Sequence, residues 1–223
     1  MTTASSSGKA YKGMGMEGMV AKWYATNTRK SLEEFKALAR RVSSDLPPGS
    51  RVLEVAPGPG YFAIELAKLG SYPVTGLDIS KTFVEIANRN AKEAGAEVDF
   101  RQGNASSMPF ENESFDFILC RAAFKNFTEP VGALQEMYRV LKAAGKGLII
   151  DLRKNAPSDA IARAVDGMGL NPLNRVVTKF VFRYVLLKRA YTEKEFREFF
   201  SRTSFRTLEI REDAIGLEIR FSK

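Results

Sequence analysis

Short apolar runs alternate with helical patterns between residues 50 and 152. The runs that predict buried strands are 51–55, 74–77, 97–101, 115–120 and 147–151. The segments between them predict helices at 61–69, 81–94 and 131–143, because their apolar residues recur at helical spacing. This alternation predicts a mostly parallel α/β sheet that is covered by helices on both faces.

The flanking segments have different patterns. One helical face is expected before the sheet, with apolar residues at Leu32, Phe35, Leu38, Ala39 and Val42. After the fifth strand come two helical patterns in 152–190, a helix at 192–201 and closing strands at 205–210 and 215–221. We therefore expect an N-terminal lid or helical segment (1–49), a core (50–152), a basic helical insertion or cap (153–191) and a closing helix with strands (192–223).

The composition removes several kinds of chemistry. The 223 residues include no histidine and one cysteine. Without imidazole there is no Ser-His-Asp or Cys-His nucleophile and no histidine-based metal site, and one cysteine excludes a CxxC site. No metal site is expected, so a reaction must depend on a cofactor, carboxylates, Tyr, Lys, Arg or Asn.

The net charge of +8 comes from 34 basic and 26 acidic residues and is unevenly distributed. Residues 51–150 hold 11 basic and 12 acidic side chains, so the surplus lies in the flanks. A nucleic-acid partner is not expected, because base flipping favours a basic cleft around the core. No run approaches the ~18 apolar residues of a membrane span, and no secretory stretch precedes the core, so we expect a cytoplasmic protein.

The loop after the first strand is rich in glycine and reads Glu54-Val55-Ala56-Pro57-Gly58-Pro59-Gly60. Glycines are needed where the backbone turns sharply and approaches a ligand. By itself this loop has two readings. It fits an acid-ended strand followed by G-x-G, and it also fits a dinucleotide fingerprint, with Asp78 placed 20 residues after Gly58.

Later segments separate these readings. In order they are Gly76-Leu77-Asp78-Ile79-Ser80, the stretch 102–110, Ser114-Phe115-Asp116-Phe117-Ile118 and the stretch 136–142. With them the chain resembles the class I S-adenosylmethionine-dependent methyltransferases, in the ubiquinone/menaquinone C-methyltransferase-like small-molecule group, over roughly residues 50–152. The resemblance implies a Rossmann-like fold with a mostly parallel seven-stranded sheet and an antiparallel C-terminal strand. It also implies S-adenosyl-L-methionine as cofactor, with S-adenosyl-L-homocysteine as product.

The resemblance also assigns cofactor-binding positions. It places Asp78 on the ribose hydroxyls, Glu54 near the methionine end and Asn104 beside the adenine amine. The remaining expected contacts are Tyr24 in a segment that folds over the cofactor, the loop residues Ala56, Pro57, Gly58 and Gly60, Ile79 and Ala105 flanking the adenine, and Arg121 after the fourth strand. Ala56 replaces the commoner first glycine. Asp78 could instead cap the helix near Ser80, and Arg121 could be a plain surface arginine.

The methyl acceptor is less well defined. Related enzymes often have a His pair after the fourth strand, where this chain has Lys125 and Asn126. Either the acceptor arrives already nucleophilic, or Asp151, Tyr11 or Tyr24 assists. Lys125, Asn126 and Arg153 are candidate substrate-binding residues, although Asp151 and Arg153 also fit a helix cap and a surface arginine.

Several functions therefore remain possible. A methyltransferase acting on a small apolar or anionic molecule is the leading hypothesis, with the acceptor atom open. A non-catalytic binding module is the alternative, followed by a dinucleotide enzyme and a nucleic-acid methyltransferase. The oligomeric state is not predicted.

Two flanking segments carry further hypotheses. The Met-rich stretch 13–19 could form a lid over an apolar substrate, although simple disorder is the favoured expectation. Arg175, Lys179 and Arg183 share one row of a predicted helix, and Leu173, Val176, Val177, Phe180 and Tyr184 share another. Segment 171–191 is thus a solvated basic face over a packed lid, a surface drawn to anionic lipid, or a lip guiding an anionic substrate; membrane contact is not favoured.

Overall fold

The computed structural model describes Tyr11, Lys12 and residues 15–223. Its α-helices are α1 (Gly18–Thr28), α2 (Leu32–Ser44), α3 (Tyr61–Ala67), α4 (Lys81–Ala94), α5 (Pro130–Val140), α6 (Ser158–Asp166), α7 (Pro172–Val181), α8 (Leu187–Arg189) and α9 (Glu193–Ser201). Its strands are β1 (Val52–Val55), β2 (Val74–Asp78), β3 (Asp99–Gln102), β4 (Phe115–Arg121), β5 (Leu141–Leu152), β6 (Thr207–Glu212) and β7 (Gly216–Ser222).

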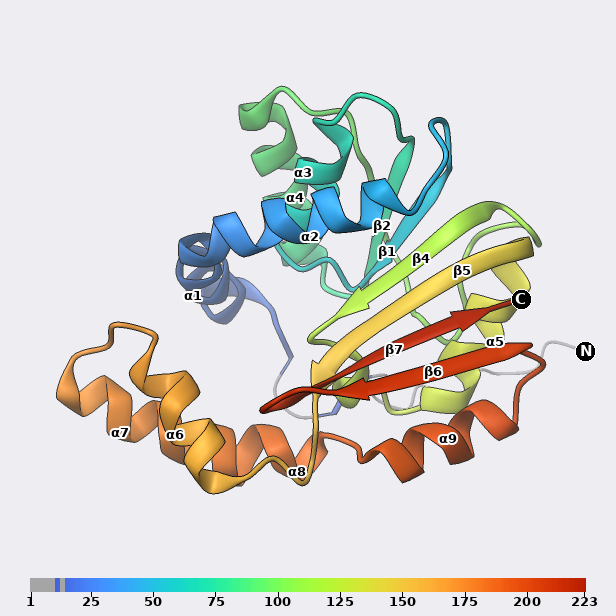
Figure 1. Ribbon diagram of the computed structural model, residues 1–223. Helices are drawn as coiled ribbons and strands as arrows, with labels where there is room; N and C mark the ends of the chain where they lie inside the picture. Colours follow the sequence, from blue (N-terminus) through green and yellow to red (C-terminus); the bar gives the residue numbers. More distant parts are fainter. Residues whose placement is uncertain (1–10, 13–14) are drawn as a thin grey trace, which may run out of the picture.

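The seven strands form one mixed sheet in the order β3-β2-β1-β4-β5-β7-β6 (Figure 1). Strands β1 to β5 are mutually parallel, whereas β7 runs antiparallel to both of its neighbours. This arrangement confirms the predicted α/β class and the antiparallel closing strand. The carboxyl ends of the parallel strands therefore meet at one edge, next to the crossover loops.

Strand β4 shows how the sheet divides the core into two layers. Phe117 and Leu119 pack with α2, α3 and α4, whereas Ile118 and Cys120 pack with α5 and α9. Successive side chains of a strand point to opposite faces, so a strand covered on both sides has to be apolar at nearly every position. The continuous apolar runs of the sequence reflect this double cover.

The fifth strand and the helix before it differ from the prediction. The expected helix at 131–143 ends at Val140, and β5 starts at once with Leu141 and continues for 12 residues. Leu141 has extended backbone angles, is fully buried and pairs with Phe115 across a β-bulge. Burial in the sheet thus ends the helix earlier than its helical pattern indicates.

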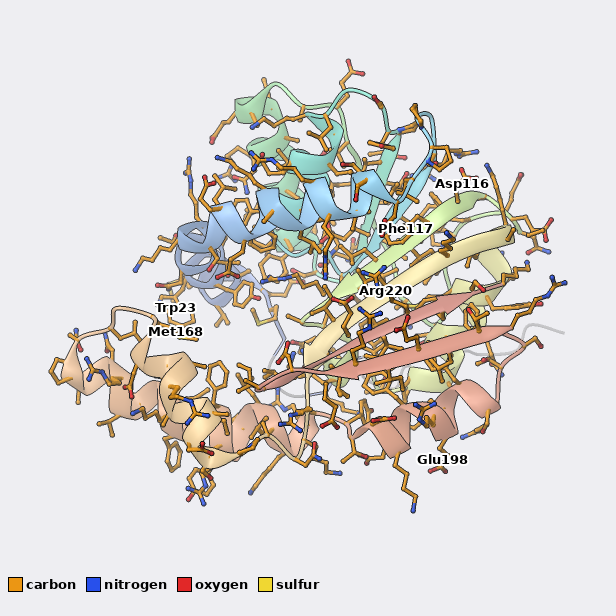
Figure 2. The ribbon with its side chains drawn as sticks, in the orientation of Figure 1. Trp23, Asp116, Phe117, Met168, Glu198 and Arg220 are labelled. Atoms are coloured by element: carbon orange, nitrogen blue, oxygen red, sulfur yellow. The ribbon has the colours of Figure 1, made fainter. Side chains whose placement is uncertain are left out.

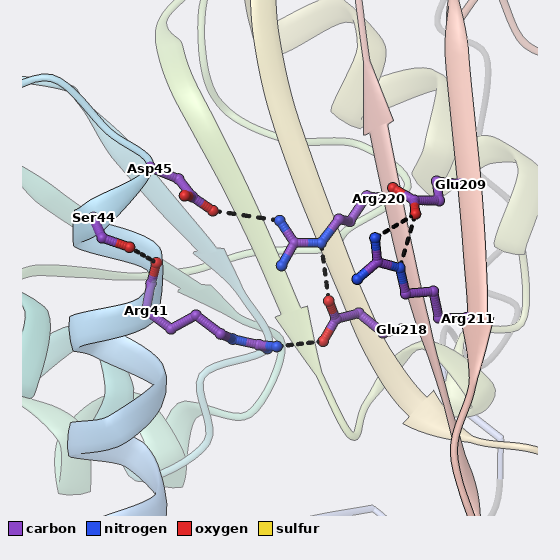
Figure 3. A network of polar contacts seen from close by, with 7 residues as sticks. All are labelled: Arg41, Ser44, Asp45, Glu209, Arg211, Glu218 and Arg220. Carbon is purple, nitrogen blue, oxygen red and sulfur yellow. Dashed lines mark hydrogen bonds and ion pairs between the residues drawn. The ribbon is translucent and has the colours of Figure 1, made fainter.

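Ion pairs connect α2 to the far part of the sheet (Figure 3). Glu218 on β7 accepts hydrogen bonds from Arg41 of α2 at 2.7 Å and from Arg220 at 2.9 Å. Arg220 also lies 3.4 Å from Asp45. These pairs are partly exposed, so each contributes little stability singly.

The excursion between β5 and α9 forms α6, α7 and α8, with a π-helical turn, Phe182–Leu186, joining the last two. Arg175 and Lys179 lie 3.5 Å and 2.9 Å from carboxylate oxygens of Asp166, at the end of α6. The apolar row of α7 is instead exposed, with Leu173 at 74% and Val176 at 67%. Of the three alternatives for segment 171–191, a solvated basic face over a packed lid therefore does not fit this helix. None of the described helices is long and apolar enough to cross a membrane.

Candidate functional site

The loop after β1 is shaped by left-handed backbone conformations. Ala56, Gly58 and Gly60 have φ of 57°, 55° and 79°. A Cβ at Gly60 would lie 2.5 Å from the ring of Phe100, so both conformation and space require glycine there. Ala56 stands where related proteins commonly have glycine, and an alanine adopts the left-handed conformation only at an energetic cost.

Asp78, at the carboxyl end of β2, joins this loop to the next one. Its Oδ2 accepts a hydrogen bond from the backbone N–H of Gly58, and its Oδ1 accepts one from Ser80, both at 2.9 Å. Ser80 is the N-cap of α4, so the alternative that Asp78 caps this helix is wrong. A Cβ added at Gly58 would lie 4.0 Å from ring atoms of Tyr24 and Phe83, which is ordinary van der Waals distance, so these two rings lie close to the loop.

Two buried carboxyl groups define the electrostatics of this region. Burial raises the pKa of Glu54 to about 8, although the N–H of Ala63 and the charge of Arg121 act against the rise. Burial also raises the pKa of Asp78 to about 6, against the hydrogen bonds from Ser80 and Gly58. Carboxyl groups held this way gain from a ligand that supplies hydrogen-bond donors or positive charge. The ribose hydroxyls and amino group of S-adenosylmethionine have that chemistry, so the residues present fit the cofactor.

Other predicted cofactor contacts are placed around the same edge. Ile79 follows Asp78 and is exposed, and Ala105 packs partly against the core. Asn104 uses its Oδ1 to accept the N–H of Ser106 at 3.0 Å, so an adenine amine would share that oxygen. Arg121 lies 3.1 Å from Glu34 and places its guanidinium over the ring of Phe35, so it is not a plain surface arginine.

Lys125 and Asp151 form a buried ion pair at the ends of β4 and β5. The Nζ of Lys125 lies 2.8 Å from Oδ1 of Asp151, and the two side chains are 5% and 1% exposed. Asp151 also accepts the backbone N–H of Lys125 at 2.9 Å and that of Leu152 at 2.8 Å. Both oxygens are thus engaged. Asp151 is no helix cap, because β5 continues to Leu152 and α6 begins only at Ser158.

The structure places the two remaining candidate substrate residues, Asn126 and Arg153, in different surroundings. Asn126 is buried next to the ion pair, and its Oδ1 has no hydrogen-bond partner among the described residues. A buried amide oxygen without a partner is costly and therefore favours a ligand donor. Arg153 instead donates to Glu212 and to the carbonyl of Ala214, so the structure holds it against β6 and the following turn.

Residues near the N-terminus reach this edge from far along the chain. Tyr11 forms an isolated β-bridge with Phe127, and the backbone N–H of Lys12 donates to the carbonyl of Asn126 at 2.7 Å. The Nζ of Lys12 donates to the hydroxyl of Tyr191. The sequence interpretation missed Lys12 and Tyr191, and a contact across 179 positions leaves no local pattern that could reveal it.

The segment before α1 is held on the start of α4. Glu17 accepts the backbone N–H groups of Lys81 at 3.1 Å and Thr82 at 3.0 Å. The carbonyl of Met16 accepts the hydroxyl of Ser80 at 2.6 Å. Of the hypothesised Met-rich lid at 13–19, Gly13 and Met14 lie outside the described residues. The part that is described fastens α1 over the cofactor loop.

The two candidate tyrosines approach the site from different directions. The Tyr24 ring lies 5.8 Å from that of Phe83, over the loop that contains Gly58. Burial raises the pKa of Tyr11 to about 12; the charge of Arg189 acts against the rise, and those of Asp78 and Asp151 add to it. Tyr11 therefore remains a neutral phenol near physiological pH, which can donate a hydrogen bond but is a poor proton acceptor.

Comparison with known proteins agrees with this geometry. Residues 53–149 match the methyltransferase domain family. The matched stretch is less than half of the chain, and together with the motif order it bears out the resemblance to the class I S-adenosylmethionine-dependent methyltransferases. The resemblance to the ubiquinone/menaquinone group is thereby confirmed, and the dinucleotide reading of the glycine loop is not favoured.

Individual relatives define the extent of the similarity. An uncharacterized methyltransferase of Bacillus subtilis is 38% identical over 127 residues, which is 56% of this chain and 47% of that protein. A demethylmenaquinone methyltransferase of Staphylococcus haemolyticus is 29% identical, over 76% of this chain and 66% of its own. The chain thus spans from about half to two thirds of these relatives.

The crystal structure of a candidate S-adenosyl-L-methionine-dependent methyltransferase from Methanococcus maripaludis shares the fold of this methyltransferase domain. It has a TM-score of 0.75, 21% identity and 97% coverage of both chains. The shared fold therefore extends well beyond residues 53–149.

Proposed function

We propose that the protein transfers a methyl group from S-adenosyl-L-methionine to a small molecule. The observation that carries this proposal is the Asp78–Gly58 link, which joins a buried carboxylate to the backbone of a left-handed glycine in the loop after β1. This is the arrangement that a ribose and an amino-acid end require at the carboxyl edge of a parallel sheet.

Each part of the site has a proposed role. Bound S-adenosylmethionine supplies an electrophilic methyl carbon. Asp78 accepts hydrogen bonds from the ribose hydroxyls, Glu54 faces the amino-acid end, and Ile79 and Ala105 flank the adenine near Asn104. The wall of the cofactor site is completed by Tyr24 and by the backbone of Ala56, Pro57, Gly58, Gly60 and Arg121. Helix α1 covers the loop and excludes water.

The acceptor side favours a molecule that arrives already nucleophilic. Asp151 is bound to Lys125 through one oxygen and to a backbone N–H through the other, so neither is free to take a proton. The raised pKa of Tyr11 disfavours this phenol as a base. We infer that amines, thiolates and stabilised anions are the suitable acceptors. Asn126 Oδ1 and the Tyr11 hydroxyl then orient the acceptor as hydrogen-bond acceptor and donor.

The size and polarity of the acceptor are inferred from the relatives and from the side chains near the glycine loop. Relatives bear the name demethylmenaquinone methyltransferase, which denotes an apolar ring substrate in those proteins. Here α1, whose Tyr24 lies near the glycine loop, exposes Met19 and Trp23. We infer a small and largely apolar acceptor. The cytoplasmic location remains a prediction.

Calorimetry with S-adenosylhomocysteine tests the cofactor part. Wild-type protein should bind it, and Asp78→Ala should weaken binding on the order of tenfold to a hundredfold. Gly58→Val should also weaken binding, because Gly58 has φ of 55°, which a valine rarely adopts. Asp99→Ala, on an exposed carboxylate of β3, is the matched control and should bind normally. Absence of binding by the wild type would overturn the proposal.

Turnover tests the transfer itself. Release of S-adenosylhomocysteine is measured with panels of amines, thiols, phenols and aliphatic alcohols. Turnover with the first three panels and not with the alcohols is expected, because an alcohol needs a base. Binding without release in every panel would support a non-catalytic binding module instead.

A further inference from the structure

The large apolar side chains that face solvent are gathered in two segments. In the described part of the chain, every large apolar side chain that is more than half exposed lies on α1 or α7. They are Met19, Trp23, Leu173, Val176, Val177 and Phe180, and we call them the apolar face. Scattered exposed apolar residues are ordinary, whereas such a concentration indicates a contact surface.

The stretches of chain that contain α1 and α7 also carry the excess charge of the protein. Residues 18–32 and 167–192 contain eight basic residues and no acidic ones. The rest of the chain therefore holds 26 basic and 26 acidic residues, so it is formally neutral. The stretches around the apolar face thus account for the net charge of +8, although Arg175 and Lys179 are paired with Asp166 just outside them.

The orientation of α7 keeps this face outward. Asp166 of α6 binds Arg175 and Lys179 and so holds one side of α7 toward the protein. Val176 and Phe180 then lie on the free side, while Arg183 and Lys188 are exposed beyond the end of the helix. A helix with apolar residues outward and basic residues at its margin has the pattern of an interfacial helix.

Both segments lie at the edge that bears the site. Figure 1 shows α1 and α6–α8 at the same side of the molecule, toward which β4 and β5 point. Trp23 on α1 and Met168 after α6 lie on this side (Figure 2). A backbone hydrogen bond of 3.1 Å from Lys154 to Tyr191 connects the segment after β5 to the end of the excursion that contains α6, α7 and α8.

We infer that the apolar face docks on the surface of an anionic lipid bilayer. The apolar side chains enter the headgroup region, and Arg183, Lys188 and Lys22 lie against the lipid phosphates. Trp23 has the ring chemistry that favours this interface. A protein partner would need acidic residues that match basic ones on two separate segments, whereas an anionic bilayer presents negative charge over any area. Docking places the crevice edge against the bilayer.

The single tryptophan of the chain gives a direct measurement. Trp23 is 66% exposed, so its emission should shift to shorter wavelength when the full chain is mixed with phosphatidylglycerol-containing vesicles. The protein should sediment with them and not with pure phosphatidylcholine. Binding should weaken when the salt rises from about 0.1 M to about 0.5 M. This readout needs neither cofactor nor turnover.

Two double variants separate the apolar and basic parts. Val176→Asp/Phe180→Asp and Arg183→Glu/Lys188→Glu should each reduce vesicle affinity by at least about tenfold. Arg89→Glu/Arg202→Glu changes the net charge equally at exposed sites on α4 and after α9, and should stay within about threefold of wild type. Circular dichroism verifies that each variant is folded.

Three results would overturn the inference. The first is a wild type that does not bind anionic vesicles. The second is double variants that bind as the control does. The third is a wild-type dimer, seen by light scattering, that Val176→Asp/Phe180→Asp separates, because a second copy would then cover the apolar face.

Discussion

The ammonium of Lys125 and the carboxylate of Asp151 meet at 2.8 Å in a nearly water-free position between β4 and β5. The same carboxylate binds the backbone N–H of Lys125, so side chain and main chain of one residue are held by one partner. The Nζ of Lys125 also donates to the carbonyl of Ala122, a residue with φ of 58°. This ion pair fixes the loop after β4, in which related enzymes often have a pair of histidines at the positions of Lys125 and Asn126.

Lys125→Met should destabilise the protein strongly. The substitution leaves a buried carboxylate without its cation, which typically costs about 3–5 kcal/mol. Lys125→Met/Asp151→Leu should recover part of this loss, because neither charge then remains buried. Urea unfolding of both variants measures the effect. Equal stability of Lys125→Met and wild type would contradict the buried-pair interpretation.

The affinity for S-adenosylhomocysteine should fall as the pH is lowered through about 6. The pKa of Asp78 is raised to about 6 by burial, and its protonated form loses acceptor strength toward ribose hydroxyls. We expect binding at about pH 5 to be on the order of tenfold weaker than at about pH 7. Calorimetry measures the change, and Asp78→Asn should be weaker throughout with a flatter profile. An equally steep profile in Asp78→Asn would assign the titration to another group.

Glu54 should make the ligand-free protein less stable as the pH rises from about 6 to about 8. Burial raises its pKa to about 8, so the folded protein keeps a proton that the unfolded chain releases above its own lower pKa. Stability is therefore lost with rising pH until the folded pKa is passed. At about 1.4 kcal/mol per pKa unit the loss amounts to a few kcal/mol.

Glu54→Gln should remove most of this loss, since the amide oxygen can still accept the N–H of Ala63. Urea unfolding at the two pH values measures it. Glu85→Gln, at an exposed position of α4, is the control and should follow the wild type. An unchanged pH dependence in Glu54→Gln would exclude Glu54 as its source.

Ala56→Gly should stabilise the protein by about 0.5–1 kcal/mol. Ala56 has φ of 57°, where an alanine Cβ crowds the following carbonyl and glycine does not. Ala63→Gly, in the right-handed helix α3, should have the opposite sign and cost about 1 kcal/mol. Thermal unfolding compares the two. A loss of stability in Ala56→Gly would show that the turn is not strained by its methyl group.

The sequence allowed the sheet and the cofactor loop to be predicted because both leave local patterns. Strands buried on two faces are continuous apolar runs, and an acid at the end of β2 is visible as Asp78. The ion pair was missed although its signal existed. Lys125 lies in the turn after β4 and Asp151 lies near the end of the neighbouring strand β5, and opposite charges at such positions predict a contact.

The orientation of α7 could not be predicted from its own residues. The sequence placed Arg175 and Lys179 in one row and the apolar residues in another, but it did not say which row faces the protein. That choice depends on Asp166, which belongs to a different helix. Similarly, helical pattern alone could not show that Leu141 would leave α5 for the sheet.

The contact between Lys12 and Tyr191 has a consequence for the order of events during synthesis. Lys12 emerges 179 residues before its partner, so this side of the crevice stays open until the chain is nearly complete. At 5–20 residues per second the delay is roughly 10–40 s. A nascent chain can therefore assemble β1 to β4 and its glycine loop well before the acceptor side of the site has closed.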